Sequence, residues 1–275
     1  MKRAVRKISK ILVRSPSSRL DLGLVSHVER VAIDNALAKR QWAGYIEVLR
    51  SAAGCDVVEV AEAEHLPDGV FVEDVVVWVN GFSPPLAIVT NPGNDLRKPE
   101  VSSVQEALLK LSLPGLQVRR IEAPGTLDGG DVLQLADADV IYVGQSSRTN
   151  AEGIAQFQSF VGAGKVVQSL PVRKVLHLKS VMTALADGEL LVWDGALDAE
   201  LLGLLTSTSR RLTKVTEEAG AHVVVINDKT LILSAAAPKT AALLRGRGFI
   251  VYTTDITEFE KLEGCVTCLS VRLRE

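Results

Sequence analysis

Two cysteines near the end of the chain are the residues best suited to covalent chemistry. In the segment GCVTCLSVRLRE, residues 264–275, Cys265 and Cys268 are three positions apart. This spacing fits a redox pair, two ligands of a metal site, or one nucleophile beside an ordinary neighbour. The spacing alone does not separate the three interpretations.

The residues around these cysteines alternate as in a strand. If CVTCLSVRL is extended, Cys265 and Cys268 point to opposite faces, because side chains alternate along a strand. A disulfide or a shared metal ion needs the two sulfurs to converge. The pattern therefore favours Cys268 as a single functional cysteine, with Cys265 as part of the core.

Other reactive side chains stand at the start of strand-like runs. They are Glu73 with Asp74, Asp128 with Asp131, and His177. A thiol, an imidazole and several carboxylates together form the set of groups required for nucleophilic catalysis with acid and base support. Each also has a structural alternative: Asp128 and Asp131 as turn residues in TLDGGD, His177 as a hydrogen-bonded core residue, and the Glu73–Asp74 pair as partners of a basic side chain.

A repeated unit along the chain predicts how these residues are positioned. Two short strand-like runs joined by a turn are followed by an amphipathic helix and another apolar run. The turns fall near residues 81, 138, 188 and 228, at intervals of roughly 40 to 57 residues. The helices are expected in SSVQEALLKL, AEGIAQFQSFVG, DAELLGLLTSTSRRL and PKTAALLRGRG.

A fifth hairpin is expected between SKILVRS near the start of the chain and CVTCLSVRL at its end. Five such units in a ring leave no exposed sheet edge and bring equivalent positions to a common axis. The alternative, a doubly wound parallel sheet, is disfavoured because its successive strands need helical crossovers rather than hairpins. We therefore expect an α/β fold of ββαβ repeats in one domain, residues 1–275.

Composition and charge exclude several classes of protein. The 275 residues carry 31 basic and 33 acidic side chains, a formal net charge of −2, which gives no general attraction to nucleic acid. The apolar run in MKRAVRKISKILVRSPSS is too short for a signal peptide, and no window is long enough to span a membrane. Three cysteines fit a reducing compartment, so we expect a cytoplasmic protein.

The motifs LPDGVFVEDVVV, GTLDGGDVL, VGQSSRTNAEG, KVLHLKS and GCVTCLSV resemble those of the dimethylarginine dimethylaminohydrolase family of the guanidino-modifying superfamily. They occur in order from about Arg14 to Arg272, nearly the whole chain. The resemblance implies a five-bladed pseudosymmetric α/β-propeller closed by its terminal strands. It also implies a hydrolase that acts on C–N bonds and converts methylated arginine to citrulline and a methylamine.

The resemblance also implies roles for individual residues. Cys268 corresponds to the nucleophile, His177 to the general acid and base, and Asp128 to a carboxylate that binds the guanidinium. The resemblance also implies substrate contacts for Asp74, Glu73 and Asp68, and binding of the substrate's α-carboxylate by Arg97 and Arg148. Leu24 corresponds to a lid over the bound amino acid, and Leu262 lies near a backbone contact to the substrate's amino group.

No metal or other cofactor is expected, although zinc captured by Cys268 and His177 would inhibit the enzyme. The expected partner is a small methylarginine substrate. Neither nucleic acid nor a membrane is expected as a partner, and the sequence leaves open whether the chain forms a homodimer. Two rival functions also stay open. One is arginine deiminase or a related guanidino hydrolase; the other is an inactive propeller that binds arginine-like ligands.

Overall fold

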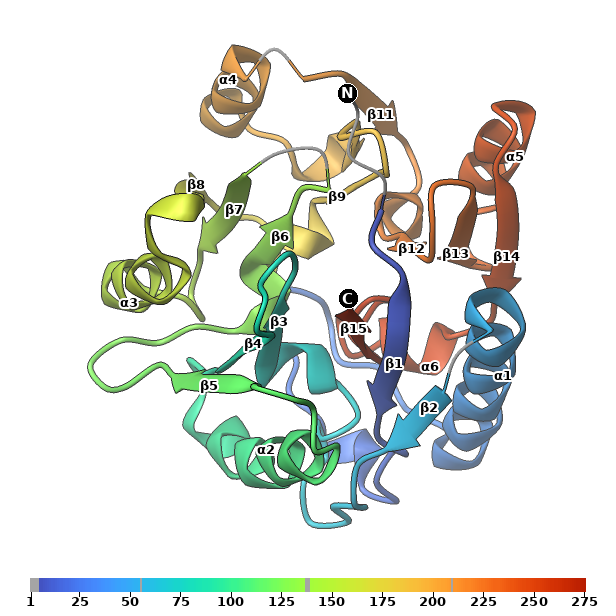
Figure 1. Ribbon diagram of the computed structural model, residues 1–275. Helices are drawn as coiled ribbons and strands as arrows, with labels where there is room; N and C mark the ends of the chain where they lie inside the picture. Colours follow the sequence, from blue (N-terminus) through green and yellow to red (C-terminus); the bar gives the residue numbers. More distant parts are fainter. Residues whose placement is uncertain (1–4, 55, 137–138, 209) are drawn as a thin grey trace.

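The computed structural model describes residues 5–54, 56–136, 139–208 and 210–275. Cys55 and residues 137–138 of the second expected turn lie outside these ranges. The described residues form an α/β fold with five sheets of three strands each (Figure 1). Within them, no helix combines the length and the apolar character needed to cross a bilayer.

The strands are β1 (Ile8–Val13), β2 (Asp56–Glu59), β3 (Val76–Val79), β4 (Leu86–Val89), β5 (Gln117–Arg120), β6 (Val132–Gln134), β7 (Val140–Gln145), β8 (Val166–Pro171), β9 (Met182–Ala184), β10 (Leu190–Trp193), β11 (Leu212–Val215), β12 (Val224–Val225), β13 (Thr230–Ser234), β14 (Ile250–Thr254) and β15 (Val271–Arg274). The helices are α1 (Asn35–Ala53), α2 (Val101–Lys110), α3 (Ala151–Val161), α4 (Ala199–Ser207), α5 (Pro238–Gly246) and α6 (Thr257–Glu260).

All five sheets have the same internal order. The first two strands form an antiparallel hairpin, and a helix then carries the chain to a third strand parallel to the second. We call these units 1 (β3–β4–α2–β5), 2 (β6–β7–α3–β8), 3 (β9–β10–α4–β11), 4 (β12–β13–α5–β14) and 5 (β15–β1–α1–β2). Unit 5 joins the two ends of the chain, with Ile8 opposite Arg274. The four internal hairpins and the terminal pairing are thus confirmed.

Local side-chain hydrogen bonds define where the helices begin and end. Asn150 accepts a hydrogen bond from the Gly153 amide at the start of α3, which satisfies a helix N–H that would otherwise lack a partner. The prediction for α4 was too long: the helix ends at Ser207, where the hydroxyl bonds back to the Leu204 carbonyl. Leu212, expected in that helix, instead begins β11 and pairs with Leu190.

The buried apolar side chains lie mainly between neighbouring units. They fall into five clusters, each combining residues of two units. One cluster joins units 5 and 1 through Leu273 and Val76, and another joins units 1 and 2 through Ile88 and Val143. Units 2 and 3, 3 and 4, and 4 and 5 are linked in the same way. Each sheet therefore depends on both neighbours for its burial.

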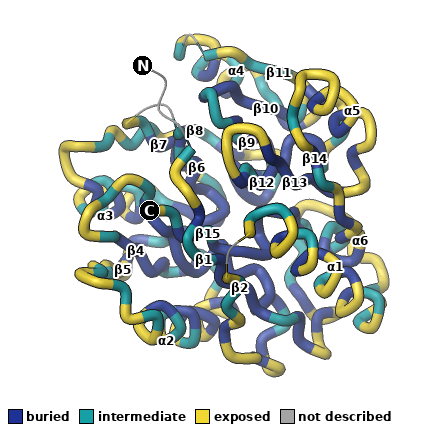
Figure 2. Tube along the Cα trace, turned by 45° about the vertical axis from the view of Figure 1, so that its right-hand side comes forward, coloured by how far each residue is buried: buried dark blue, intermediate teal, exposed yellow. Residues whose placement is uncertain are grey.

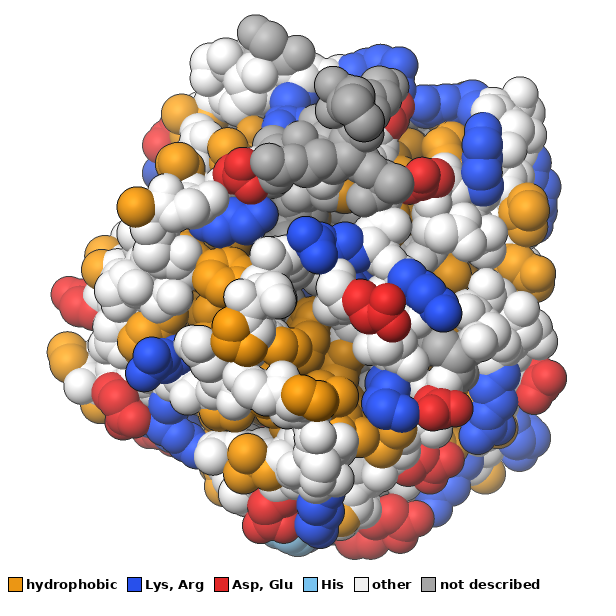
Figure 3. Space-filling model, in the orientation of Figure 1, with side chains coloured by type: hydrophobic (Ala, Val, Ile, Leu, Met, Phe, Trp, Pro, Cys, Tyr) orange, Lys and Arg blue, Asp and Glu red, His pale blue; other side chains and the backbone are white. Residues whose placement is uncertain are grey.

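The surface and interior differ as this arrangement requires. Figure 2 shows long buried stretches in the strands and exposed outer faces on the helices. On the face drawn in Figure 3, acidic and basic side chains are interspersed, in keeping with the near balance of charges in the sequence.

The buried hydroxyl of Tyr45 links α1 to the segment that carries the two cysteines. It donates to the Val266 carbonyl at 2.8 Å and lies 2.7 Å from the Ser270 hydroxyl. Tyr45 is fully buried, so water cannot replace it as a partner for these groups. The helix thereby fixes the entry to β15.

We expect Tyr45→Phe to lower the free energy of unfolding by about 1–3 kcal/mol, because it leaves buried polar groups without their partner. Urea denaturation of the full chain measures this change. Tyr252→Phe, at a half-buried position, is the control. An unchanged midpoint for Tyr45→Phe would show that these hydrogen bonds do not stabilise the fold.

Candidate active site

A short turn precedes the first strand of every unit, and these turns carry the reactive side chains. Four are 3-10 turns at residues 72–74, 129–131, 178–180 and 218–221, and unit 5 has a turn over residues 266–269. The buried polar and thiol side chains in or next to these turns are Glu73, Asp74, Asp128, Asp131, His177, Lys179, His222, Cys265 and Cys268. The turns therefore gather groups from distant parts of the sequence.

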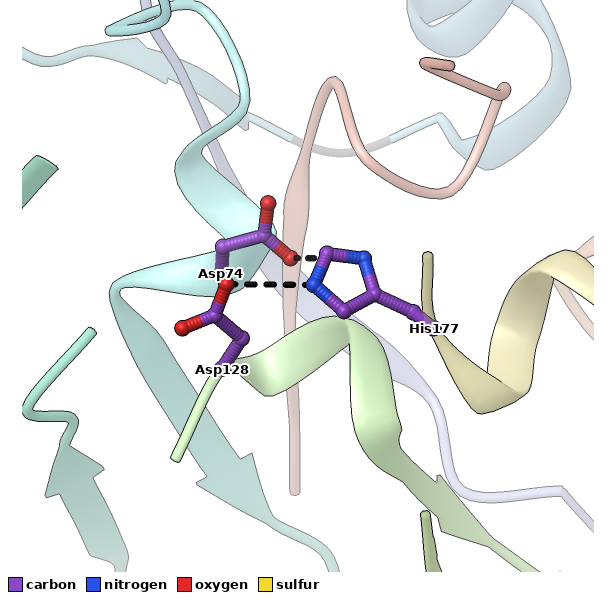
Figure 4. A group of neighbouring side chains, drawn as sticks. All are labelled: Asp74, Asp128 and His177. Carbon is purple, nitrogen blue, oxygen red and sulfur yellow. Dashed lines mark hydrogen bonds and ion pairs between the residues drawn. The ribbon is translucent and has the colours of Figure 1, made fainter. Parts of the chain in front are cut away.

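His177 lies between two carboxylates from other units (Figure 4). Its Nε2 is 3.1 Å from Asp128 Oδ2, and its Nδ1 is 3.9 Å from Asp74 Oδ1. Burial alone would lower the pKa of His177, but Asp74, Asp128 and Asp131 outweigh it and raise that pKa to about 9. The imidazole is therefore a cation at neutral pH.

Two glycines of the LDGGD motif let these groups come together. A Cβ on Gly130 would lie 2.6 Å from His177 Nδ1 and 2.7 Å from Asp74 Oδ1. A Cβ on Gly129 would lie 2.0 Å from the Glu73 carbonyl oxygen. The Gly130 amide also donates to Asp74 Oδ1 at 3.0 Å. Only a residue without a side chain allows this close approach.

The Asp131 carboxylate positions the backbone next to His177 directly and the Asp128 backbone through the Thr149 hydroxyl. Its Oδ1 accepts from the amide of Leu178, and its Oδ2 accepts from the Thr149 hydroxyl at 2.7 Å. That hydroxyl in turn accepts from the Asp128 amide. Burial raises the pKa of Asp131 to about 6, against the opposing effect of His177 and the donated hydrogen bonds. Asp131 thus fixes the backbone on both sides of the His177–Asp128 contact.

The prediction that the two thiols diverge is wrong. Residues 266–269 form a turn, and the Cys268 amide donates to the Cys265 carbonyl at 3.0 Å, so β15 begins only at Val271. Residues three apart in a helical turn lie on the same side. The two sulfurs are accordingly 3.2 Å apart. Cys265 is a buried core residue, as expected, but it also contacts Cys268 directly.

The two arginines expected to bind a carboxylate are buried against acids. Arg97 Nη1 lies 2.5 Å from Asp74 Oδ2, and Arg97 also donates to both oxygens of Glu100. Arg148 Nη1 lies 3.4 Å from Asp128 Oδ2. Burial alone would raise the pKa of Asp74, but His177 and Arg97 hold it at about 2.

Cys268, His177 and Asp74 line one small cavity of about 20 Å³. Its other lining residues are Leu24, Asp68, Phe71, Arg97, Arg148, Leu176, Leu262, Glu263 and Gly264. A space of this size has room for about one water molecule. Most of the residues expected to contact a substrate thus surround a single space, and an amino acid can enter only after part of the wall moves.

The segment around Leu24 closes this cavity and is held by two carboxylates. The Leu24 amide donates to both oxygens of Asp68, at 3.0 and 3.1 Å. The amides of Ser26 and His27 donate to Glu263. Because these contacts are hydrogen bonds from one short segment, breaking them would open the cavity without disturbing a sheet.

Glu73 lies on the wall of a different cavity, of about 140 Å³. Its Oε1 is 2.6 Å from Lys179 Nζ and 2.6 Å from Arg272 Nη2. Burial opposes ionisation, but these two cations lower the pKa of Glu73 overall. The carboxylate is therefore engaged by basic side chains of the protein, and the structure does not bring it to the cavity lined by Cys268.

Sequence reasoning gave no role to three residues that hold the site. Lys179 pairs with Glu73, Glu100 with Arg97, and Glu263 with the segment that carries Leu24. Lys179 had a signal in the motif KVLHLKS, next but one to the histidine. Glu100 had one in its position three residues after Arg97, a spacing that brings side chains together in a helical turn. Glu263 had none, because the segment it holds lies far away in the sequence.

Asp74, Asp128 and His177 could in principle ligate a metal ion, since one donor atom from each lies within 4.8 Å of the others. The same carboxylates already contact Arg97 and Arg148. Two guanidinium groups beside the donor set repel a cation, and a protonated imidazole is not a ligand.

Comparison with known proteins places this arrangement in a family. A sequence model described as "N,N dimethylarginine dimethylhydrolase, eukaryotic" matches residues 26–273. A dimethylarginine dimethylaminohydrolase of Streptomyces coelicolor is 48% identical over 97% of both chains. The corresponding protein of Pseudomonas aeruginosa is 32% identical over 95% of this chain and 98% of its own.

A solved structure extends the similarity to the whole fold. The P. aeruginosa enzyme in a cysteine-to-serine variant complexed with citrulline superposes with a TM-score of 0.85 at 30% identity. The match covers 97% of this chain and 99% of that one. The chain therefore belongs to the dimethylarginine dimethylaminohydrolase family.

Proposed function

We propose that this protein hydrolyses Nω-methylated arginine to citrulline and a methylamine, with Cys268 as nucleophile and His177 as acid and base. The similar proteins of Streptomyces coelicolor and Pseudomonas aeruginosa bear the name of this activity. The observation that supports it most is that Cys268, His177 and Asp74 line one cavity. A thiol, an imidazolium and a carboxylate in contact with the same space can attack, protonate and orient a guanidinium.

The substrate's guanidinium is a delocalised cation, and its central carbon is a poor electrophile. Asp74 and Asp128 are the carboxylates best placed to fix its plane, because both are buried and lie within reach of His177. Arg97 and Arg148 now pair with these two acids. We propose that the substrate guanidinium takes over part of that pairing, while the arginines turn to the substrate's α-carboxylate.

The charge of the substrate also changes the nucleophile. The hydrogen bond to Cys265, burial, and the acids Asp74 and Glu73 all raise the pKa of Cys268. A guanidinium bound beside Asp74 opposes the negative potential of these carboxylates. The thiol of Cys268 then loses its proton more easily, so binding activates the group that attacks.

Two steps then complete the reaction. The Cys268 sulfur bonds to the guanidinium carbon, and the C–N bond to the methylated nitrogen breaks as His177 donates a proton to the departing amine. His177, now neutral, takes a proton from water, whose oxygen attacks the same carbon. The C–S bond breaks as the new hydroxyl group loses its proton to the solvent, which releases citrulline and the thiolate. Asp128 holds the imidazole through Nε2 and stabilises its charged form.

Leu24 and Leu262 belong to the closing wall in this proposal. Asp68 holds the segment of Leu24 while the cavity is closed, and we expect it to face the substrate's amino acid end when the segment opens and recloses. Glu73 acts indirectly, as the partner of Lys179 and Arg272 at the base of the site.

We infer further that the five units are the blades of a pseudosymmetric α/β-propeller closed by β1 and β15. The cyclic order of the apolar clusters supports this arrangement, because the last cluster links unit 4 back to unit 5. We also propose that the chain forms a single domain, needs no cofactor and acts in the cytoplasm, and that it can form a homodimer.

The decisive test is to incubate the protein with asymmetric dimethylarginine and, in parallel, with unmethylated arginine. We expect citrulline and dimethylamine from the first and much slower citrulline formation from the second, by mass spectrometry. Cys268→Ser should abolish turnover while substrate still binds, since the serine hydroxyl is a weaker nucleophile at neutral pH. Substantial turnover by this folded variant would reject Cys268 as nucleophile. Faster release of ammonia from arginine would indicate a deiminase.

Replacing His177 by Ala should reduce kcat by about 10²–10⁴-fold, the usual contribution of a positioned acid–base group. In the unaltered enzyme kcat/KM should fall above pH about 9, where His177 loses its proton. The raised pKa of His177 also adds to the free energy of unfolding. This contribution is fully present below pH 6.5 and is lost as the pH rises through about 9. A flat kcat/KM profile across this range would show that His177 does not act as the acid.

Asp131→Asn should lower kcat by roughly 10–100-fold with a smaller change in KM, because an amide cannot accept all the hydrogen bonds that position His177 and Asp128. It also removes a charge that raises the pKa of His177, so the alkaline limb of kcat/KM should move to lower pH. Asp56→Asn, at an exposed pair with Lys10, is the control. If the alkaline limb of the kcat/KM profile stays at the same pH in Asp131→Asn, Asp131 has only a structural role.

A further inference from the structure

We propose that Cys265 is a resolving thiol for Cys268, so that peroxide converts the two into a reversible intramolecular disulfide that switches the enzyme off. The inference rests on the proposed function only for the loss of activity. The formation of the disulfide itself can be measured without any substrate.

The turn over residues 266–269 already holds the two sulfurs in the arrangement that this reaction needs. Their separation is 3.2 Å, and the backbone hydrogen bond from Cys268 to Cys265 keeps both side chains on one side of the turn. A disulfide requires about 2.05 Å between the sulfurs. The remaining gap of about 1 Å is within the reach of small side-chain rotations at the two cysteines.

The two thiols differ in access. Cys268 lines the small cavity next to His177, whereas Cys265 lies behind it and does not line that cavity. Both are at least nine-tenths buried. An oxidant that enters when the segment of Leu24 opens therefore meets Cys268 first, and the sulfur nearest to Cys268 is that of Cys265.

The surroundings favour Cys265 as the sulfur that resolves the oxidised form. It contacts the Thr267 hydroxyl at 3.3 Å, and its hydrogen bond with Cys268, together with the nearby His222, lowers its pKa to about 5 despite burial. The carboxylates of Glu218 and Glu260 oppose ionisation of Cys265. The pair thus shares one proton, and the negative charge is stabilised best at Cys265.

The chemistry balances with hydrogen peroxide as oxidant. Cys268 attacks one peroxide oxygen, the O–O bond breaks, and the pair's single proton leaves with the other oxygen as water, so that Cys268 carries a sulfenic acid. The Cys265 thiolate then attacks the Cys268 sulfur and expels hydroxide. Together the two sulfurs lose two electrons and peroxide gains them. A dithiol reductant reverses the change by thiol–disulfide exchange.

Such a bond has two consequences for the site. It removes the nucleophile, so turnover stops while the bond persists. It also prevents further oxidation of Cys268 to the sulfinic and sulfonic acids, which ordinary reductants do not reverse. Only Val266 and Thr267 lie between the two cysteines, and both belong to a turn outside the strands, so the sheets need not move.

The test uses the full chain with Cys55→Ser, which removes the third thiol. After brief peroxide treatment we expect an intact mass lower by two hydrogen atoms, a peptide linking Cys265 to Cys268, and complete loss of activity that dithiothreitol restores. In Cys265→Ser, or in Cys265→Ala if the serine variant folds poorly, we expect sulfinic acid at Cys268 and no recovery. Each activity is normalised to the untreated sample of the same variant.

The outcomes separate this inference from the proposed function. A disulfide found by mass in a chain that does not act on dimethylarginine supports the thiol pair and rejects the activity. An active enzyme whose Cys268 reaches the sulfinic acid at the same rate with and without Cys265, and without any disulfide, overturns the thiol pair and leaves the activity intact.

Discussion

The buried carboxylates of Glu73 and Asp74 are paired with cations at the centre of this protein, and the positions of the other reactive groups depend on these pairs. Glu73 is matched by Lys179 and Arg272, and Asp74 by His177 and Arg97. An unpaired buried charge costs several kcal/mol, so each partner is required if the others are to stay ionised. Because the pairs join different units, the same contacts that balance the charge also fix the relative positions of the reactive groups.

The repeated unit explains why such a centre can form at all. Each unit places a short turn before its first strand, and the turns meet where the sheets end. Backbone atoms then come very close, as between Gly129 and the Glu73 carbonyl. Glycine at these positions lets acids from units 1 and 2 reach His177 of unit 3. The positioning of the imidazole is thus a property of the backbone, and Asp131 secures it through the Leu178 amide.

Much of the fold could be predicted from hydrophobic period, because hairpins and amphipathic helices are local features. The convergence of Asp74, Asp128 and His177 was predictable once equivalent positions of the repeats were compared. The arrangement of the two thiols was not. CVTCLSVRL has the alternation of a strand, but tertiary contacts around it, such as Tyr45 with Val266, favour a turn. Partners such as Glu263 also escaped prediction, because its hydrogen bonds with Ser26 and His27 join residues far apart in the sequence.

The charge balance links the two properties of the cysteine turn. The hydrogen bond to Cys265, burial and the nearby carboxylates raise the pKa of Cys268, and the segment held by Asp68 and Glu263 covers this thiol. A neutral, covered thiol reacts slowly with oxidants. When a cation enters, the same step that opens the cavity and ionises Cys268 for catalysis also exposes it to peroxide. A second thiol at 3.2 Å is useful under those conditions, because it reacts with the oxidised sulfur before another oxidant molecule can arrive. In the proposed mechanism, catalytic activation and sensitivity to oxidation therefore depend on the same event, the loss of the Cys268 proton, which the hydrogen bond to Cys265, burial and the nearby acids oppose.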